Sequence, residues 1–227
     1  MDVGVAPLNS RYVDLMSGSF EINQVGQRLI ATFRGGFIPE DPWQLKGKSF
    51  DLLKFVQGQW STLEWLVALD LTATEIFVLA EVDNFRSVAD VKGLRRLEVE
   101  TGRLDGLDFD RLGELTSLSV PWNNKLKGKI GRLKKLQKLK IVSYKEQSLD
   151  EFSTLANLRE LTLTQGSVST LAGLEGCRQL ETLELSYLRK LEDIAAIGSL
   201  DQLKTLHVEK CPHVKSVDCI APLSGLD

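Results

Sequence analysis

The stretch LRELTLTQGSVSTLAGLEGCRQL, residues 158–180, contains the pattern that decides the fold. Its regularly placed apolar residues are Leu158, Leu161, Leu163, Val168, Leu171, Leu174 and Leu180. The spacing is two between Leu161 and Leu163, and it becomes three from Val168 onward. An amphipathic helix would repeat every 3.6 residues and a half-buried strand every two, so neither period alone explains the stretch. The spacing predicts a short strand followed by 3₁₀-like or extended turns.

The same frame recurs along most of the chain. Its eight copies are FDLLKF from Phe50, ATEIFV from Ala73, LRRLEV from Leu94, LTSLSV from Leu115, LQKLKI from Leu136, LRELTL from Leu158, LETLEL from Leu180 and LKTLHV from Leu203. Successive copies start 21 to 23 residues apart. A fixed period of this length is the signature of a repeat protein, in which each unit buries its apolar side against its neighbours. The sequence therefore predicts a solenoid.

This frame resembles the leucine-rich repeat family, whose pattern L-x-x-L-x-L-x-x-N/C-x-L it follows from about Phe50 to Asp227. Two copies, at Asn123 and Cys211, keep the family's asparagine-or-cysteine position, and the other six depart from it. The resemblance implies an α/β fold: a curved, horseshoe-shaped solenoid with a concave parallel β-sheet and a convex side of short 3₁₀ or irregular segments. It indicates a scaffold and specifies no ligand.

Residues 1–49 lie outside the frame and contain only four of the 39 leucines. Within them, Ser19–Phe33 has two β-compatible arms around a glycine, which predicts a β-hairpin. We expect residues 1–49 to be an N-terminal capping segment, and residues 50–227 to be a solenoid of about eight repeats. A small independent functional domain is the alternative for the first segment. Near the other end, Leu223 and Leu226 are expected to cover the last core layer.

The composition argues against several classes of protein. A formal net charge of −3 argues against a dedicated nucleic-acid binder, whose surface is usually strongly basic. The apolar stretches are too short to span a bilayer, and the first residues show no signal-peptide pattern. The three cysteines are far apart and odd in number, so they do not suggest a disulfide framework. We therefore expect a cytoplasmic protein that does not contact a membrane.

The sequence offers few groups for catalysis. Motifs for phosphate loops, dinucleotide binding, zinc proteases and nucleophile elbows are all missing. Cys211, His213 and Cys219 could suggest zinc, but Cys211 occupies an inward repeat position and structural zinc normally has four ligands. Core cysteines, Cys177 among them, and surface histidines are the favoured interpretation. We expect no enzymatic activity, no catalytic residue, no cofactor, no metal site and no small-molecule substrate.

The strongest charge feature is a basic run between Lys125 and Lys145. Its members are Lys125, Lys127, Lys129, Arg132, Lys134, Lys135, Lys138, Lys140 and Lys145. A nucleic-acid patch is one interpretation. The intervening leucines fill inward repeat positions and few aromatic residues interleave, so a solvated face or a contact with an acidic protein is favoured.

Alternation along each predicted strand leaves one set of side chains on the open face of the sheet. Between the two inward strand positions these are Lys54, Phe77, Glu98, Ser119, Lys140, Thr162, Glu184 and His207. From this position and the positions two and three residues after it, we predict a partner-binding surface made of Phe77, Glu98, Glu100, Trp122, Lys140, Val142, Thr162, Glu184, Tyr187 and His207. Exposed aromatic residues anchor many interfaces, so Trp122 and Tyr187 are the strongest contact candidates. Phe77 and Leu79 have a second interpretation, as contacts of the capping segment.

These features favour a non-catalytic module that binds a partner protein through its concave face. By analogy of fold, one such role is a bacterial immunity protein, a stoichiometric inhibitor of a toxin. The alternative is a signalling or assembly scaffold, or the regulatory subunit of an enzyme. Nucleic-acid binding through the basic run ranks third.

Overall fold

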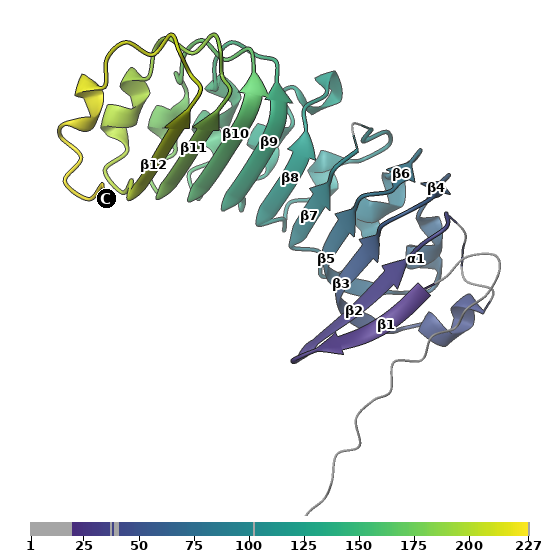
Figure 1. Ribbon diagram of the computed structural model, residues 1–227. Coiled ribbons are helices and arrows are strands. Elements are labelled where there is room, and N and C mark those ends of the chain that lie inside the picture. The colour runs from purple at the N-terminus through teal and green to yellow at the C-terminus, as the bar shows by residue number, and fades with distance from the viewer. Residues whose placement is uncertain (1–19, 37, 39–40, 102, 227) are drawn as a thin grey trace, which may run out of the picture.

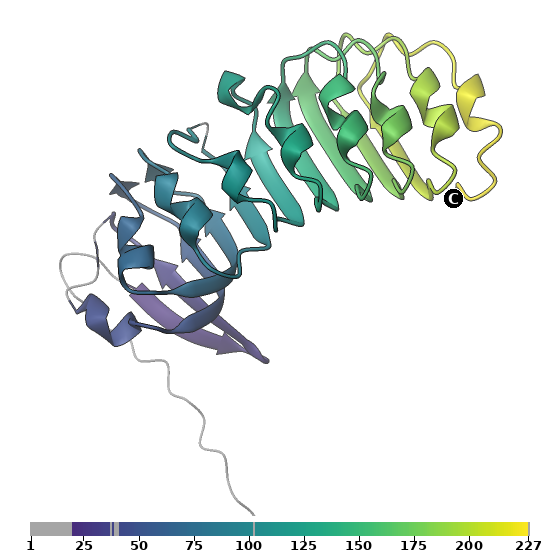
Figure 2. The ribbon, with the colours of Figure 1, turned by 180° about the vertical axis from the view of Figure 1, so that it is seen from behind.

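The computed structural model describes residues 20–36, 38, 41–101 and 103–226. They form a curved solenoid in which a ten-stranded sheet makes one face and short helical segments run along the other (Figures 1 and 2). The strands are β1 (Phe20–Val25), β2 (Arg28–Phe33), β3 (Ser49–Phe55), β4 (Gln59–Trp60), β5 (Thr72–Val78), β6 (Glu81–Val82), β7 (Arg96–Val99), β8 (Ser117–Pro121), β9 (Lys138–Tyr144), β10 (Glu160–Gly166), β11 (Thr182–Ser186) and β12 (Thr205–Glu209).

Every copy of the repeat frame contains one strand of the large sheet. The strand order is β1-β2-β3-β5-β7-β8-β9-β10-β11-β12, and all pairings from β2 onward are parallel. Equivalent positions pair across neighbouring repeats, as Leu161 does with Leu139 and Leu183. The prediction of a solenoid with a parallel sheet is confirmed.

The inward positions of the frame make the core. All seven apolar residues that mark the pattern in residues 158–180 are 0% exposed. Burying one leucine side chain stabilises the fold by roughly 1.5–3 kcal/mol. Each repeat contributes only one thin layer, so its leucines are buried only because a neighbouring repeat lies on either side.

The chain returns to the next strand through short helical segments. They are η1 (Pro42–Leu45), α1 (Glu64–Ala68), η2 (Arg86–Asp90), η3 (Phe109–Arg111), η4 (Asn124–Leu126), η5 (Ile130–Arg132), η6 (Asp150–Thr154), η7 (Leu174–Gly176), η8 (Ala195–Ser199) and η9 (Asp218–Ile220). Glycine allows some of them to approach closely: a Cβ atom on Gly176 would collide with the carbonyl oxygen of Ser153 in the preceding repeat. Within the described residues, no helix has the length and hydropathy needed to cross a membrane.

The N-terminal end of the sheet begins with a hairpin. β1 and β2 pair antiparallel, and Gly26 supplies the left-handed turn residue with φ of 62°. β2 also pairs in parallel with β3 and places Ala31 and Phe33 opposite Leu53 and Phe55. The repeat frame therefore extends one strand earlier than predicted, into residues 28–33, where alanine replaces the marker leucine. Residues 1–19 of the expected capping segment lie outside the described residues, so its boundary stays a prediction.

The first repeats have an aromatic core. Phe33 and Phe55 stack with ring centroids 5.1 Å apart, and Trp65 meets Phe33 edge-on at 5.0 Å. Trp60 lies 5.4 Å from Phe55 and is only 1% exposed. Each such aromatic pair adds roughly 0.5–1.5 kcal/mol beyond the burial of its area.

At the C-terminal end, the last strand is less completely covered. Leu223 and Leu226 are half-buried and pack against the core, as predicted. Val208 occupies an inward position of β12 but remains 39% exposed.

Candidate protein-binding face

The open side of the sheet, which we call the concave face, presents continuous rows of side chains. One row contains Lys54, Phe77, Glu98, Ser119, Lys140, Thr162, Glu184 and His207, and each member pairs with the next. Neighbouring strands lie about 4.8 Å apart, so eight strands make a row about 34 Å long. Nine of the ten predicted partner-binding residues are half-buried or exposed on this face and its rim.

A further row of side chains lies on this face and was not predicted. It contains Leu52, Glu75, Arg96, Ser117, Lys138, Glu160, Thr182 and Thr205, also paired from strand to strand. The alternation along each strand was the available signal, because these residues lie two positions before the first row. They widen the face by one row.

A shallow pocket opens on the concave face over β3, β5 and β7. It has a volume of 210 Å³, and its lining residues are Leu52, Lys54, Glu75, Ile76, Phe77, Arg96 and Glu98. The ammonium group of Lys54 lies 5.6 Å from the centroid of the Phe77 ring. Arg96 and Glu98 form an ion pair of 3.6 Å across the rim. The pocket thus combines apolar and charged side chains, as sites that take a partner's side chain commonly do.

Phe77 and Leu79 keep exposed surface. β3 separates β5 from the hairpin strands, and Leu79 is 37% exposed. Within the described residues, both side chains thus keep exposed surface on the concave side.

The prediction that Trp122 is an exposed contact residue is wrong. Its side chain is only 5% exposed, and its ring meets that of Tyr144 edge-on with centroids 4.5 Å apart. The backbone conformation explains the difference. At the equivalent position of the next four repeats the backbone is left-handed, with φ between 53° and 62°, whereas Trp122 does not adopt this conformation. The four left-handed residues are Ser143, Gln165, Tyr187 and Lys210. The indole of Trp122 enters the core instead of the rim.

Tyr187, in contrast, is an exposed rim residue. It is 38% exposed, and the ammonium group of Lys210 donates a hydrogen bond of 2.6 Å to its hydroxyl and lies 4.4 Å from its ring centroid. The same ammonium group pairs with Glu209 at 3.1 Å, and His207 lies 3.7 Å from that carboxylate. The hydrogen bond from Lys210 lowers the pKa of Glu209, so this carboxylate is charged at neutral pH. The C-terminal rim is thus an ordered polar cluster.

Similar solved structures identify the architecture. An internalin from Listeria monocytogenes matches with a TM-score of 0.54 and 17% identity over 85% of this chain and 64% of its own. The functional domain of InlJ from the same organism matches with a TM-score of 0.53 and 21% identity, over 69% of this chain and 34% of its own. A leucine-rich repeat protein from Leptospira interrogans matches with a TM-score of 0.55 and 15% identity. The match covers 78% of this chain and 54% of that protein. This chain has the leucine-rich repeat fold. It spans between about a third and two thirds of the length of these structures.

No protein-family model and no curated protein matches the sequence. The assignment of the leucine-rich repeat fold therefore rests on the repeat frame and on the similarity of structure.

The basic run of this leucine-rich repeat solenoid is largely neutralised by neighbouring repeats. Five of its nine members form ion pairs: Lys125 with Asp105, Lys127 with Glu146, Arg132 with Asp110, Lys135 with Glu114, and Lys138 with Glu160. A nucleic-acid site needs unpaired cations to neutralise phosphates. The pairing favours the interpretation of a solvated face.

The thiols of the solenoid are placed for packing. Cys177 is 0% exposed, its Sγ lies 3.2 Å from the carbonyl oxygen of Phe152, and burial raises its pKa to about 11. A thiol with this pKa is protonated at neutral pH and is a poor nucleophile. Cys211 and Cys219 are half-buried, and their Sγ atoms face backbone carbonyls. In the part of the chain that the structure describes, no three His, Cys, Asp or Glu residues gather as a metal site would require.

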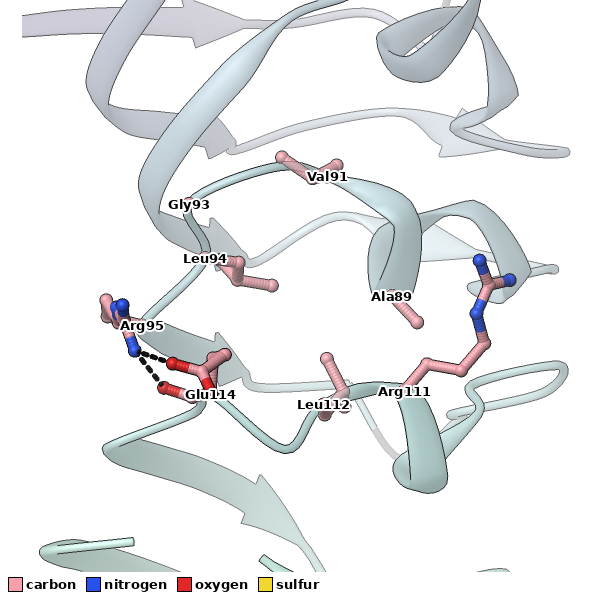
Figure 3. Close-up of a pocket in the computed structure, with 8 residues that line it drawn as sticks. All are labelled: Ala89, Val91, Gly93, Leu94, Arg95, Arg111, Leu112 and Glu114. Carbon is pink, nitrogen blue, oxygen red and sulfur yellow. Dashed lines mark hydrogen bonds and ion pairs between the residues drawn. The ribbon is translucent and has the colours of Figure 1, made fainter. Parts of the chain in front are cut away.

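A further hollow, of 170 Å³, lies between η2 and the segments that lead into β7 and β8 (Figure 3). Arg95 donates a hydrogen bond of 2.5 Å to Glu114 at one end, and Arg111, which also lines the hollow, pairs with Asp90. Its apolar walls belong to the buried core. Since its arginines already have partners, this hollow is a gap between consecutive repeats and offers little to a ligand.

Proposed function

We propose that this protein is a non-catalytic module that binds a partner protein through the concave face of its leucine-rich repeats. The observation that supports this most directly is the continuous, in-register surface of two side-chain rows across eight strands. Solenoids commonly use such extended surfaces for recognition. Apolar side chains such as Phe77 and Tyr187 lie on this surface among charges, as in the anchors of protein interfaces.

The pKa values of three surface carboxylates favour binding over catalysis at those positions. Glu114, Glu181 and Glu209 have lowered pKa values because lysine or arginine side chains hydrogen-bond to them on the surface. A general acid or base needs a pKa near neutrality inside a cleft. These carboxylates are solvated ion-pair partners, which suits a binding scaffold.

Affinity capture tests the proposal. The full chain and two variants serve as baits, and captured proteins are identified by mass spectrometry. The first variant combines Phe77→Arg and Tyr187→Ala on the concave face and rim. The second, Asp201→Lys, changes an exposed residue outside the sheet and outside the basic run and is the control. We expect a partner retained by the wild type and the control but lost by the concave variant. A partner that all three baits retain equally would contradict the concave assignment.

The stoichiometry of the captured complex then separates two finer roles. For an immunity protein that inhibits a toxin, we expect a two-component complex in native mass spectrometry and loss of the toxin's activity on mixing. For a scaffold or regulatory subunit, we expect an assembly of several different chains. The free thiols of Cys177, Cys211 and Cys219 support placing either role in the reducing cytoplasm.

A further inference from the structure

The pocket over β3, β5 and β7 has an uneven distribution of charge. Among its four charged side chains, Arg96 and Glu98 pair with each other at 3.6 Å. Glu75 pairs at 3.0 Å with Arg28, which reaches it from β2. Across the described residues, Lys54 forms no ion pair and is the one charged group of the pocket without an opposite partner. The four charged side chains of the pocket sum to zero, but Lys54 is the one that is available to pair with a group of a partner.

Part of the pocket lining is apolar and remains half-exposed. Leu52 and Phe77 lie on adjacent strands, in neighbouring rows of the concave face, and neither is fully buried. The core side of the same strands is already filled, because Leu53 and Ile76 are at most 1% exposed. The apolar surface of Leu52 and Phe77 is thus not needed for the core and faces solvent.

The size of the pocket indicates what it can hold. Pockets for small organic ligands usually enclose about 300–1,000 Å³. This pocket measures 210 Å³ and is open along the sheet. It is too small and shallow to enclose such a ligand, but it fits one side chain presented by a protein surface.

We propose that this pocket is the specificity site of the concave face. It receives one apolar side chain of the partner over Leu52 and Phe77, and an aspartate or glutamate next to that side chain pairs with Lys54. The rest of the concave face then supplies surface complementarity. This inference rests on the proposed function and adds the chemistry of the partner segment.

Selection from a displayed library of random linear peptides tests this inference. The full-length wild type, Phe77→Ala, Lys54→Glu and Val67→Ala are used as parallel targets. Val67 is an exposed apolar residue of α1, away from the concave face, so its variant is the control. We expect the wild type and the control to enrich peptides in which an apolar residue lies beside an acidic one. Phe77→Ala should reduce the affinity of these peptides about tenfold or more.

Charge reversal keeps the test decisive if Phe77→Ala alters the local structure. Lys54→Glu should weaken the acidic peptides, and replacing their acidic residue with lysine should restore binding to this variant alone. Failure of the wild type to enrich such peptides, or equal binding by wild type and Phe77→Ala, would overturn the proposal. So would the absence of rescue by charge reversal.

The two proposals can fail separately. If a captured partner is lost with Tyr187→Ala but retained with Phe77→Ala and Lys54→Glu, the concave face binds the partner and the pocket does not. If no concave variant affects the partner, the proposed function itself is wrong.

Discussion

The concave face over β3, β5 and β7 differs from that over β9 to β12, although both follow one repeat frame. The first region presents the apolar residues Leu52, Val56, Phe77 and Leu79 between charges. The second presents mostly hydroxyl and charged residues: Lys138, Lys140, Thr162, Thr164, Thr182, Glu184, Ser186 and His207. The cores also differ. A cluster of aromatic rings fills the first repeats, whereas leucines dominate the later ones, where Tyr144 and Phe152 are buried beside them.

The difference between the two regions shows that the repeat restricts the inward positions and not the outward ones. Inward positions must fill a layer of fixed thickness, so their size and polarity are restricted in both regions. Outward positions touch only solvent and each other, and the frame leaves them free. We therefore expect stability to be sensitive along the whole solenoid, and partner recognition to be concentrated in the apolar region.

The largest effect is expected at Trp122, which directly follows β8, the strand between the two regions. Replacing this buried indole with alanine should lower the free energy of unfolding by about 3–5 kcal/mol, because it leaves a cavity beside Tyr144. Tyr187→Ala, at the equivalent but exposed position, should cost less than about 1 kcal/mol. Urea unfolding measures both. Equal losses would mean that the two positions do not differ in burial.

The next effect concerns binding. Once a partner is known, Phe77→Ala should weaken its affinity by about 2 kcal/mol or more, since a partly buried aromatic anchor carries much of an interface's energy. Thr162→Ala, in the same row of the other region, should change it by less than about 0.5 kcal/mol. Calorimetric titration gives both values. A larger effect at Thr162 than at Phe77 would reverse the comparison.

A smaller difference in stability between the two regions is expected from backbone conformation. Gln165 has φ of 60°, a conformation that β-branched side chains strongly disfavour. Gln165→Thr should therefore destabilise the fold by roughly 1–2 kcal/mol. Gln57 holds the equivalent position in the first region without a positive φ, and Gln57→Thr should be nearly neutral. Thermal unfolding of the pair tests whether the left-handed turn belongs to the later repeats alone.

The smallest effect depends on pH. Burial raises the pKa of Glu151 above 4.5, although its carboxylate accepts hydrogen bonds from Tyr144 and from the backbone N–H of Gly128. Glu151 therefore loses its proton at a lower pH in the unfolded chain than in the folded one. As the pH rises from about 4.5 through the raised pKa, this difference lowers the free energy of unfolding.

Glu151→Gln retains an acceptor for Gly128 and removes the buried charge. The variant should be more stable than the wild type at pH 7, with a smaller difference at pH 4. Denaturant unfolding at both values measures this, and Glu192→Gln, at an exposed glutamate, controls for the loss of one surface charge. Lower stability of Glu151→Gln at pH 7 would contradict the expectation.

Most of the fold could be predicted because leucines at a fixed period leave few arrangements open. The hairpin was also readable from its two arms and its central glycine. β2 was not recognised as a repeat strand because Ala31 and Phe33 take the inward positions without a leucine marker. A sequence pattern that accepts any apolar residue at the inward positions, and not only leucine, would have included β2.

The candidate surface was predicted less completely. Alternation placed Phe77, Glu98 and Lys140 on the open face, but one whole row was missed and one aromatic residue was assigned to the wrong side. Trp122 and Tyr187 occupy the same position in the frame, so their spacing is identical. Only the backbone dihedral angle, which depends on how neighbouring repeats stack, separates them.

The sequence by itself determined the period, the inward residues and the parallel order of the strands, because apolar side chains at fixed intervals have to be removed from water together. The tertiary structure alone decided which outward residues converge. The pocket of Leu52, Phe77 and Lys54, and the contact of Lys210 with Tyr187, join residues of different repeats. Such contacts arise from the register between strands and from local turn conformation, which no single repeat encodes.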